Sequence, residues 1–101
     1  MSGPLDQFAA LKAENQRTLI DFLRVDLDLA FTLLETAKIE ADSNPARCEA
    51  VLGKVRVALE STRLFQKRID DPDESGKIND RADELEAALA AFRAKDSGTP
   101  I

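Results

Sequence analysis

Apolar residues recur at intervals of three and four between residues 19 and 41, which is the spacing of an amphipathic helix. On a wheel of about 100° per residue they spread over roughly 240°, whereas a helix beside a single small core needs about 100–160°. One neighbouring helix cannot cover so wide a face, so we expect a second surface to pack against it. The face consists of two ridges, which we name after their first residues, with Ile20 and Phe31 flanking the second: the Phe22 ridge (Phe22, Val25, Leu29 and Leu33) and the Leu23 ridge (Leu23, Leu27, Ala30 and Leu34).

Two prolines divide the chain into three helical segments. Pro45 follows Ser43 and Asn44, either of which can cap a helix whose first position is the proline. Pro72 follows Asp71 in the same way. The apolar spacing predicts helices over about 4–41, 45–70 and 72–95, with no alternating pattern typical of strands. Because both connections are short, the sequence predicts an all-α, antiparallel three-helix bundle.

The first segment is longer than the bundle that it helps to form. A helix over 4–41 measures about 57 Å at 1.5 Å per residue, against about 38 Å for 45–69. Polar residues at 14–18 also interrupt its apolar pattern. Either the helix breaks near 14–18, or residues 1–15 overhang the bundle as an arm. We expect one domain over 1–101, with a frayed tail at 96–101.

The composition argues against catalysis. The 101 residues include no His, Trp or Tyr, so the commonest general base and metal ligand is missing. Cys48, the single cysteine, falls on the apolar side of the second segment, where we expect a buried thiol. We therefore predict no enzyme activity, no cofactor and no metal site. The sequence shows neither a signal peptide nor a membrane span, and we expect a soluble, cytoplasmic protein with no membrane partner.

The net charge of −5 is unevenly distributed and disfavours a nucleic-acid partner. Residues 1–42 carry four basic and eight acidic side chains, residues 43–69 six and two, and residues 70–101 four and nine. A basic middle helix between two acidic ones indicates charge complementarity within the bundle. Asp26 lies inside the apolar arc of the first helix, where an unpaired carboxylate is costly. We expect it to form a buried ion pair with Arg56 or Arg63.

An acidic segment, 71–82, resembles the calcium loop of the EF-hand family. In that comparison Asp71, Asp73, Ser75 and Asn79 match ligand positions, and Gly76 matches the turn. The twelfth position is Ala82, where the family has a bidentate glutamate. The resemblance implies a weak calcium site over Asp71–Asn79, which is the alternative function. A plain helix start, capped by Asp71, explains the same residues without a metal.

The leading interpretation is a non-enzymatic interaction or oligomerisation module. We expect the Phe22 ridge to face a partner and the Leu23 ridge to face the chain's own helices, although the reverse assignment also fits the pattern. Leu5 and Phe8 need a surface too, and we count them with the interface. The simplest partner is a second copy in a homodimer, and another protein is the alternative. A minor stripe on the second segment favours self-association: Ala46, Ala50, Gly53, Val57 and Leu64.

Overall fold

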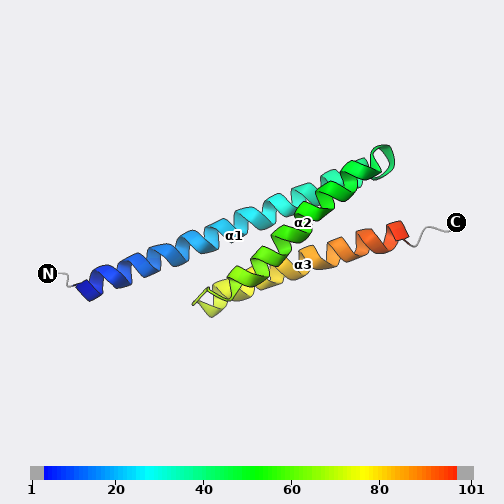
Figure 1. Cartoon of the computed structure of the whole chain (residues 1–101). Coiled ribbons are helices and arrows are strands. Elements are labelled where there is room, and N and C mark those ends of the chain that lie inside the picture. The colour runs from blue at the N-terminus through cyan, green and yellow to red at the C-terminus, as the bar shows by residue number, and fades with distance from the viewer. Residues whose placement is uncertain (1–3, 98–101) are drawn as a thin grey trace.

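The computed structural model describes residues 4–97, apart from the side chains of residues 4–6, 8, 9 and 94–97. Helices α1 (Pro4–Ser43), α2 (Pro45–Gln66) and α3 (Pro72–Ser97) run antiparallel to one another in sequence order (Figure 1). No strand occurs within residues 4–97. The predicted all-α three-helix bundle is therefore confirmed.

Side-chain caps account for both breaks between helices. Asn44 Oδ1 accepts a hydrogen bond from the backbone N–H of Arg47 at 3.2 Å, and Pro45 takes the first position of α2. Asp71 Oδ1 accepts from the backbone N–H of Asp73 at 2.9 Å, again with a proline at the first helical position. Each cap satisfies a backbone donor that has no partner within its own helix.

Helix α1 is continuous through residues 14–18, so the break considered there does not occur and the overhanging arm does. Figure 1 shows the N-terminal part of α1 extending well past the α2–α3 connection, and the molecule is 71 Å long but only 21 Å and 15 Å across. Gln16 marks where the bundle begins. Its Nε2 donates to the carbonyl of Arg68, and its Oε1 accepts from the N–H of Asp70, both at 2.8 Å. The polar interruption of the pattern is thus the docking point of the α2–α3 loop.

The predicted end of the second helix, near residue 70, is wrong by four residues. Helix α2 ends at Gln66, and the next two hydrogen bonds close tighter turns: Arg68 N–H to Phe65 and Ile69 N–H to Gln66. Ile69 is nevertheless buried in the core, because it keeps the spacing of three and four that continues from Thr62 and Phe65. The pattern therefore identified a buried residue correctly while assigning it to the wrong element.

One core lies between the three helices. The Leu23 ridge is buried completely, together with a matching face on each of the other helices. The main contributors from α2 and α3 are Cys48, Val51, Leu52, Val55, Leu59, Ile78, Ala82, Leu85 and Leu89. At positions 4–97, none of the helices combines the length and apolarity that crossing a bilayer requires.

Polar contacts hold α3 against the other two helices. Arg63 on α2 donates to Asn79 Oδ1 at 2.8 Å, to Asp83 Oδ1 at 2.6 Å and to Glu86 Oε2 at 2.8 Å. The hydrogen bond that Arg63 donates to Asp83 is the main reason that the pKa of the Arg63 guanidinium is raised above its ordinary value, against the opposing effect of burial. The expected complementarity between a basic α2 and an acidic α3 is found here.

Candidate interaction surface

The Phe22 ridge is left uncovered by the chain itself. Phe22, Val25 and Leu29 are 58%, 67% and 54% exposed, whereas every residue of the Leu23 ridge is at most 1% exposed. Leu33, the last member of the Phe22 ridge, is partly buried against the core. The structure thus decides between the two assignments of the ridges: the Leu23 ridge faces α2 and α3, and most of the Phe22 ridge faces outward.

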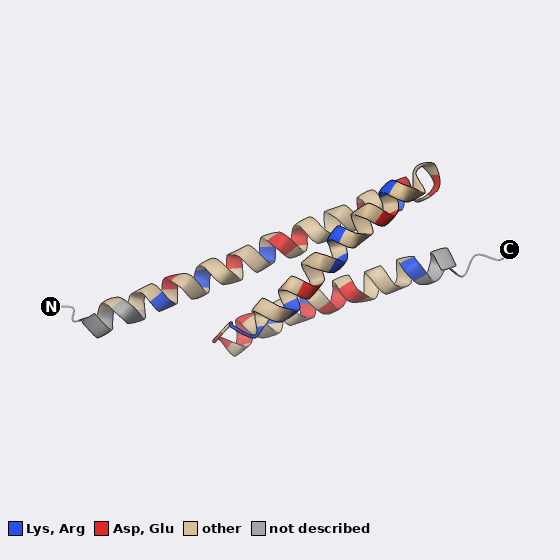
Figure 2. Ribbon diagram, in the orientation of Figure 1, with Lys and Arg blue, Asp and Glu red and all other residues tan. Residues whose placement is uncertain are grey.

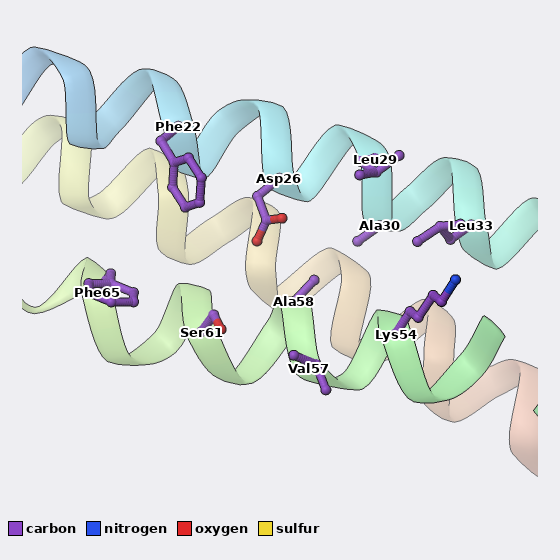
Figure 3. A pocket seen from close by; sticks show the side chains of 10 residues that line it. All are labelled: Phe22, Asp26, Leu29, Ala30, Leu33, Lys54, Val57, Ala58, Ser61 and Phe65. Carbon is purple, nitrogen blue, oxygen red and sulfur yellow. The ribbon is translucent and has the colours of Figure 1, made fainter. Parts of the chain in front are cut away.

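A groove of about 310 Å³ runs beside this ridge, between α1 and α2. Figure 3 shows that α3 passes behind the groove, so the groove opens on the side of the α1–α2 pair that α3 does not cover. The α1 side chains lie along one wall and the α2 side chains along the other. The lining residues are Phe22, Asp26, Leu29, Ala30, Leu33, Lys54, Val57, Ala58, Ser61 and Phe65.

Helix α2 extends the apolar surface across the groove. Val57 and Leu64, which we call the α2 apolar pair, are 62% and 59% exposed. They are seven residues apart and therefore lie on one face of the helix. Large apolar side chains are thus exposed on both helices that border the same groove, which is unlike the scattered single exposures of an ordinary surface.

The expected ion pair of Asp26 with Arg56 or Arg63 is not formed. Arg63 turns to α3, as described above, and Arg56 Nη2 lies 3.7 Å from Glu49 on its own helix. Among the described side chains, Asp26 has no ion-pair partner, and Figure 3 shows its carboxylate pointing into the groove. The groove leaves this carboxylate only half-buried, so water can solvate it and no buried arginine is required.

Acidic side chains border the Phe22 ridge. Asp21, Asp26 and Asp28 all lie between or next to its members in the sequence, and Asp28 turns to α3, where its Oδ1 lies 3.6 Å from Arg81 Nη2. Figure 2 shows acidic positions recurring along α1. Arg24 is the only basic residue of this stretch, and it points to α3, where its Nη2 donates to Glu74 Oε2 at 2.5 Å. The α2 side of the groove contributes a cation instead, Lys54. The two walls of the surface therefore carry opposite charge.

The arm of α1 is described only in part. Residues 10–15 are all exposed, and Leu11 is the large apolar residue among them. One ion pair links this region to the bundle, with Lys12 Nζ 3.5 Å from Asp70. The side chains of Leu5 and Phe8, which we included in the predicted interface, lie outside the described part of the structure.

The segment that resembles a calcium loop is a helix start. Helix α3 begins at Pro72, so Asp73, Ser75 and Asn79 are helical residues rather than ligands converging from a loop. Asp71 uses Oδ1 to cap this helix. No cluster of three or more metal-ligating side chains is present among the described residues. Residues 71–82 therefore do not have the geometry of an EF-hand loop, because Asp71 and Pro72 start the helix at the first two positions of the segment.

Sequence reasoning missed two contacts that shape the surface. Gln16 looked like part of a polar interruption, and its link to a loop 52 residues away has no local signal. Phe31 belongs to the wide apolar face, and the guanidinium of Arg81 on α3 covers it, with its carbon 3.9 Å from the ring centroid. The one hint of this contact in the sequence is that Arg81 lies at helical spacing from the core positions of α3.

Comparison of the chain with protein-family models, with curated proteins and with solved structures gives no match.

Proposed function

We propose that this chain is a non-enzymatic helical interaction module that forms a homodimer through the Phe22 ridge and the adjoining α2 surface. The observation that carries the proposal is the exposure of Phe22, Val25 and Leu29, three large apolar side chains on successive turns of a helix whose other face is fully buried. Burying such a side chain releases about 1.5–3 kcal/mol relative to full exposure, so a partner that covers the ridge is favoured.

The groove beside the ridge supports the same proposal. The helices of a second copy can pack against α1 and α2 in the way that helices pack in bundles, with side chains of one entering the spaces of the other. The Phe22 ridge and the α2 apolar pair then form the apolar centre of the contact, and the acidic and basic side chains around them form its polar rim. We assign no cofactor to this role, and another protein with a similar helical face is the alternative partner.

Light scattering on the purified protein tests the proposal. We expect a mass of about 22 kDa at tens of micromolar, twice the 11.1 kDa of one chain. Val25→Glu and Leu29→Glu should each shift the mass to that of one chain while the far-ultraviolet circular dichroism stays helical, because both side chains lie outside the core. Ala91→Glu on α3 introduces the same charge at another exposed position and should leave the dimer intact. A wild-type mass of one chain at these concentrations would overturn the proposal.

A further inference from the structure

The proposed homodimer can be arranged in two ways, and the charges around the groove distinguish them. We infer that the two copies are related by a two-fold axis parallel to the helices, so that the Phe22 ridge of each copy lies over the α2 apolar pair of the other. This inference rests on the proposed function, since it specifies how the second copy sits. It also places both α1 arms at the same end of the dimer.

The apolar surfaces of α1 and α2 are level with each other along the bundle. In Figure 3, Phe22 faces Phe65 at one end of the groove, and Leu33 faces Lys54 at the other. The Phe22 ridge and the α2 apolar pair therefore occupy the same stretch of the bundle, side by side. A two-fold rotation about an axis parallel to the helices does not change a residue's position along the bundle, but it brings α1 of one copy opposite α2 of the other. Each Phe22 ridge therefore meets the partner's α2 apolar pair with no shift along the helix axis.

A two-fold axis across the helices gives an equally good apolar match but pairs like with like. It places α1 against α1 and α2 against α2, in antiparallel orientation. The carboxylates of Asp21 and Asp26 would then face the same two carboxylates of the second copy, because Arg24 is already engaged by Glu74 on α3. Asp28 does not count here, since its Oδ1 lies 3.6 Å from Arg81 Nη2 on α3. Like charges brought together across an interface disfavour it.

The parallel axis places acidic α1 over basic α2 instead. Lys54 and Lys67 are exposed, and within the described residues neither forms an ion pair. Lys67 lies two residues beyond Phe65 and Asp21 one residue before Phe22, so this arrangement brings them to the same level of the dimer. Other basic side chains of α2 are engaged within the chain: Arg63 by Asp83 and Glu86 of α3, and Arg56 by Glu49. Lys54 and Lys67 therefore supply the positive charge of this face. Because the dimer is symmetric, an acidic α1 faces a basic α2 in both halves of the interface, and this favours the arrangement.

The exposed apolar area of this face is also large enough for a stable homodimer. Five apolar side chains are each more than half exposed on this face: Phe22, Val25, Leu29, Val57 and Leu64. At roughly 100 Å² each, they amount to about 1,000 Å² of apolar surface in a dimer. A standard interface buries about 1,600 Å², of which about 60% is apolar. The face therefore supplies the apolar part of an interface of ordinary size.

Disulfide crosslinking tests the arrangement. Val25→Cys and Leu64→Cys are made as single variants of the full chain, and the wild type controls for the buried Cys48. Each variant is first confirmed as a dimer by light scattering, then oxidised alone and as an equimolar mixture. We expect a covalent dimer that joins residue 25 to residue 64 in the mixture only, identified by mass spectrometry. Efficient crosslinking of Val25→Cys alone would establish the antiparallel arrangement and overturn the inference.

The remaining outcomes are also decisive. A chain that is monomeric by light scattering removes the proposed function and this inference together. A dimer that gives no 25–64 crosslink in the mixture removes the inference and leaves the proposed function standing. Charge reversal is a second measurement: Asp21→Lys and Lys67→Glu should each weaken the dimer about tenfold, and the two together should restore its affinity. Equal weakening in the double variant would count against the pairing of α1 with α2.

Discussion

Replacement of Asp26 by leucine should stabilise the fold, although a carboxylate within an apolar arc is usually held by a partner. The structure gives Asp26 no ion pair among the described residues and places it half-buried in the groove, beside Phe22 and Phe65. A leucine that is half-buried there gains about 1 kcal/mol of apolar burial. The higher helix propensity of leucine adds about 0.5 kcal/mol. We expect Asp26→Leu to raise the free energy of unfolding by about 1.5 kcal/mol.

Urea denaturation followed by circular dichroism at 222 nm measures this change. The experiment is best done in the Val25→Glu background, so that dimer dissociation does not contribute to the transition. With an m-value of about 1.5 kcal/mol/M, the midpoint should rise by about 1 M. Asp26→Asn is the control, because it removes the charge while keeping the shape, and its midpoint should change little.

A decrease in the free energy of unfolding of Asp26→Leu would refute this reasoning. Loss of one partner from a buried ion pair costs about 3–5 kcal/mol, because the other charge is left buried and unpaired. A midpoint that falls by 1 M or more in Asp26→Leu, with a similar fall in Asp26→Asn, would show that the carboxylate of Asp26 holds an arginine in solution. The two interpretations of Asp26 thus differ in the direction of the effect and not only in its size.

Three further predictions concern stability. Gln16→Ala removes both hydrogen bonds to the α2–α3 loop and should cost about 1–2 kcal/mol in urea denaturation, whereas Asn15→Ala at the exposed neighbouring position should cost nothing; equal effects would mean that the loop is not anchored there. Leu27→Ala in the core should cost about 2–5 kcal/mol, and Leu29→Ala should cost less than 1 kcal/mol in the Val25→Glu monomer; similar losses would contradict the assignment of the two ridges. Asp71→Ala should lower stability by about 1 kcal/mol through loss of the cap, and 1 mM calcium should leave the melting temperature of the wild type unchanged within a degree; a calcium-dependent rise would contradict the helical geometry of this segment.

The fold was largely predictable because each signal that specifies it is local. Proline after a capping residue identified both helix breaks, and the buried residues of all three helices recur at the spacing of three and four from which the helices were predicted. The wide apolar face of α1 was likewise visible, since it depends only on positions along one helix. What the spacing could not decide was which ridge the chain buries, because both ridges satisfy the same periodicity.

Long-range polar contacts were the part that the sequence could not provide. Arg63 was a candidate partner for Asp26, but its direction depends on how α2 is rotated between α1 and α3, which a helical wheel of one helix does not give. Gln16 is similar, since its partners belong to a loop whose path follows from the end of α2. The early end of α2 at Gln66 was hidden for a related reason: Ile69 keeps the apolar spacing after the helix has stopped.

The melting temperature of the wild-type chain as a function of its concentration is the most direct test of the central claim that the Phe22 ridge is covered by a second copy. Dissociation and unfolding of a dimer are coupled, so its melting temperature rises with concentration. For two chains of 101 residues and about 0.7 kcal/mol of unfolding enthalpy per residue, a hundredfold increase in concentration should raise it by about 7 °C. The Val25→Glu variant should show no such dependence. A wild-type melting temperature that stays constant within a degree over the same range would contradict the account.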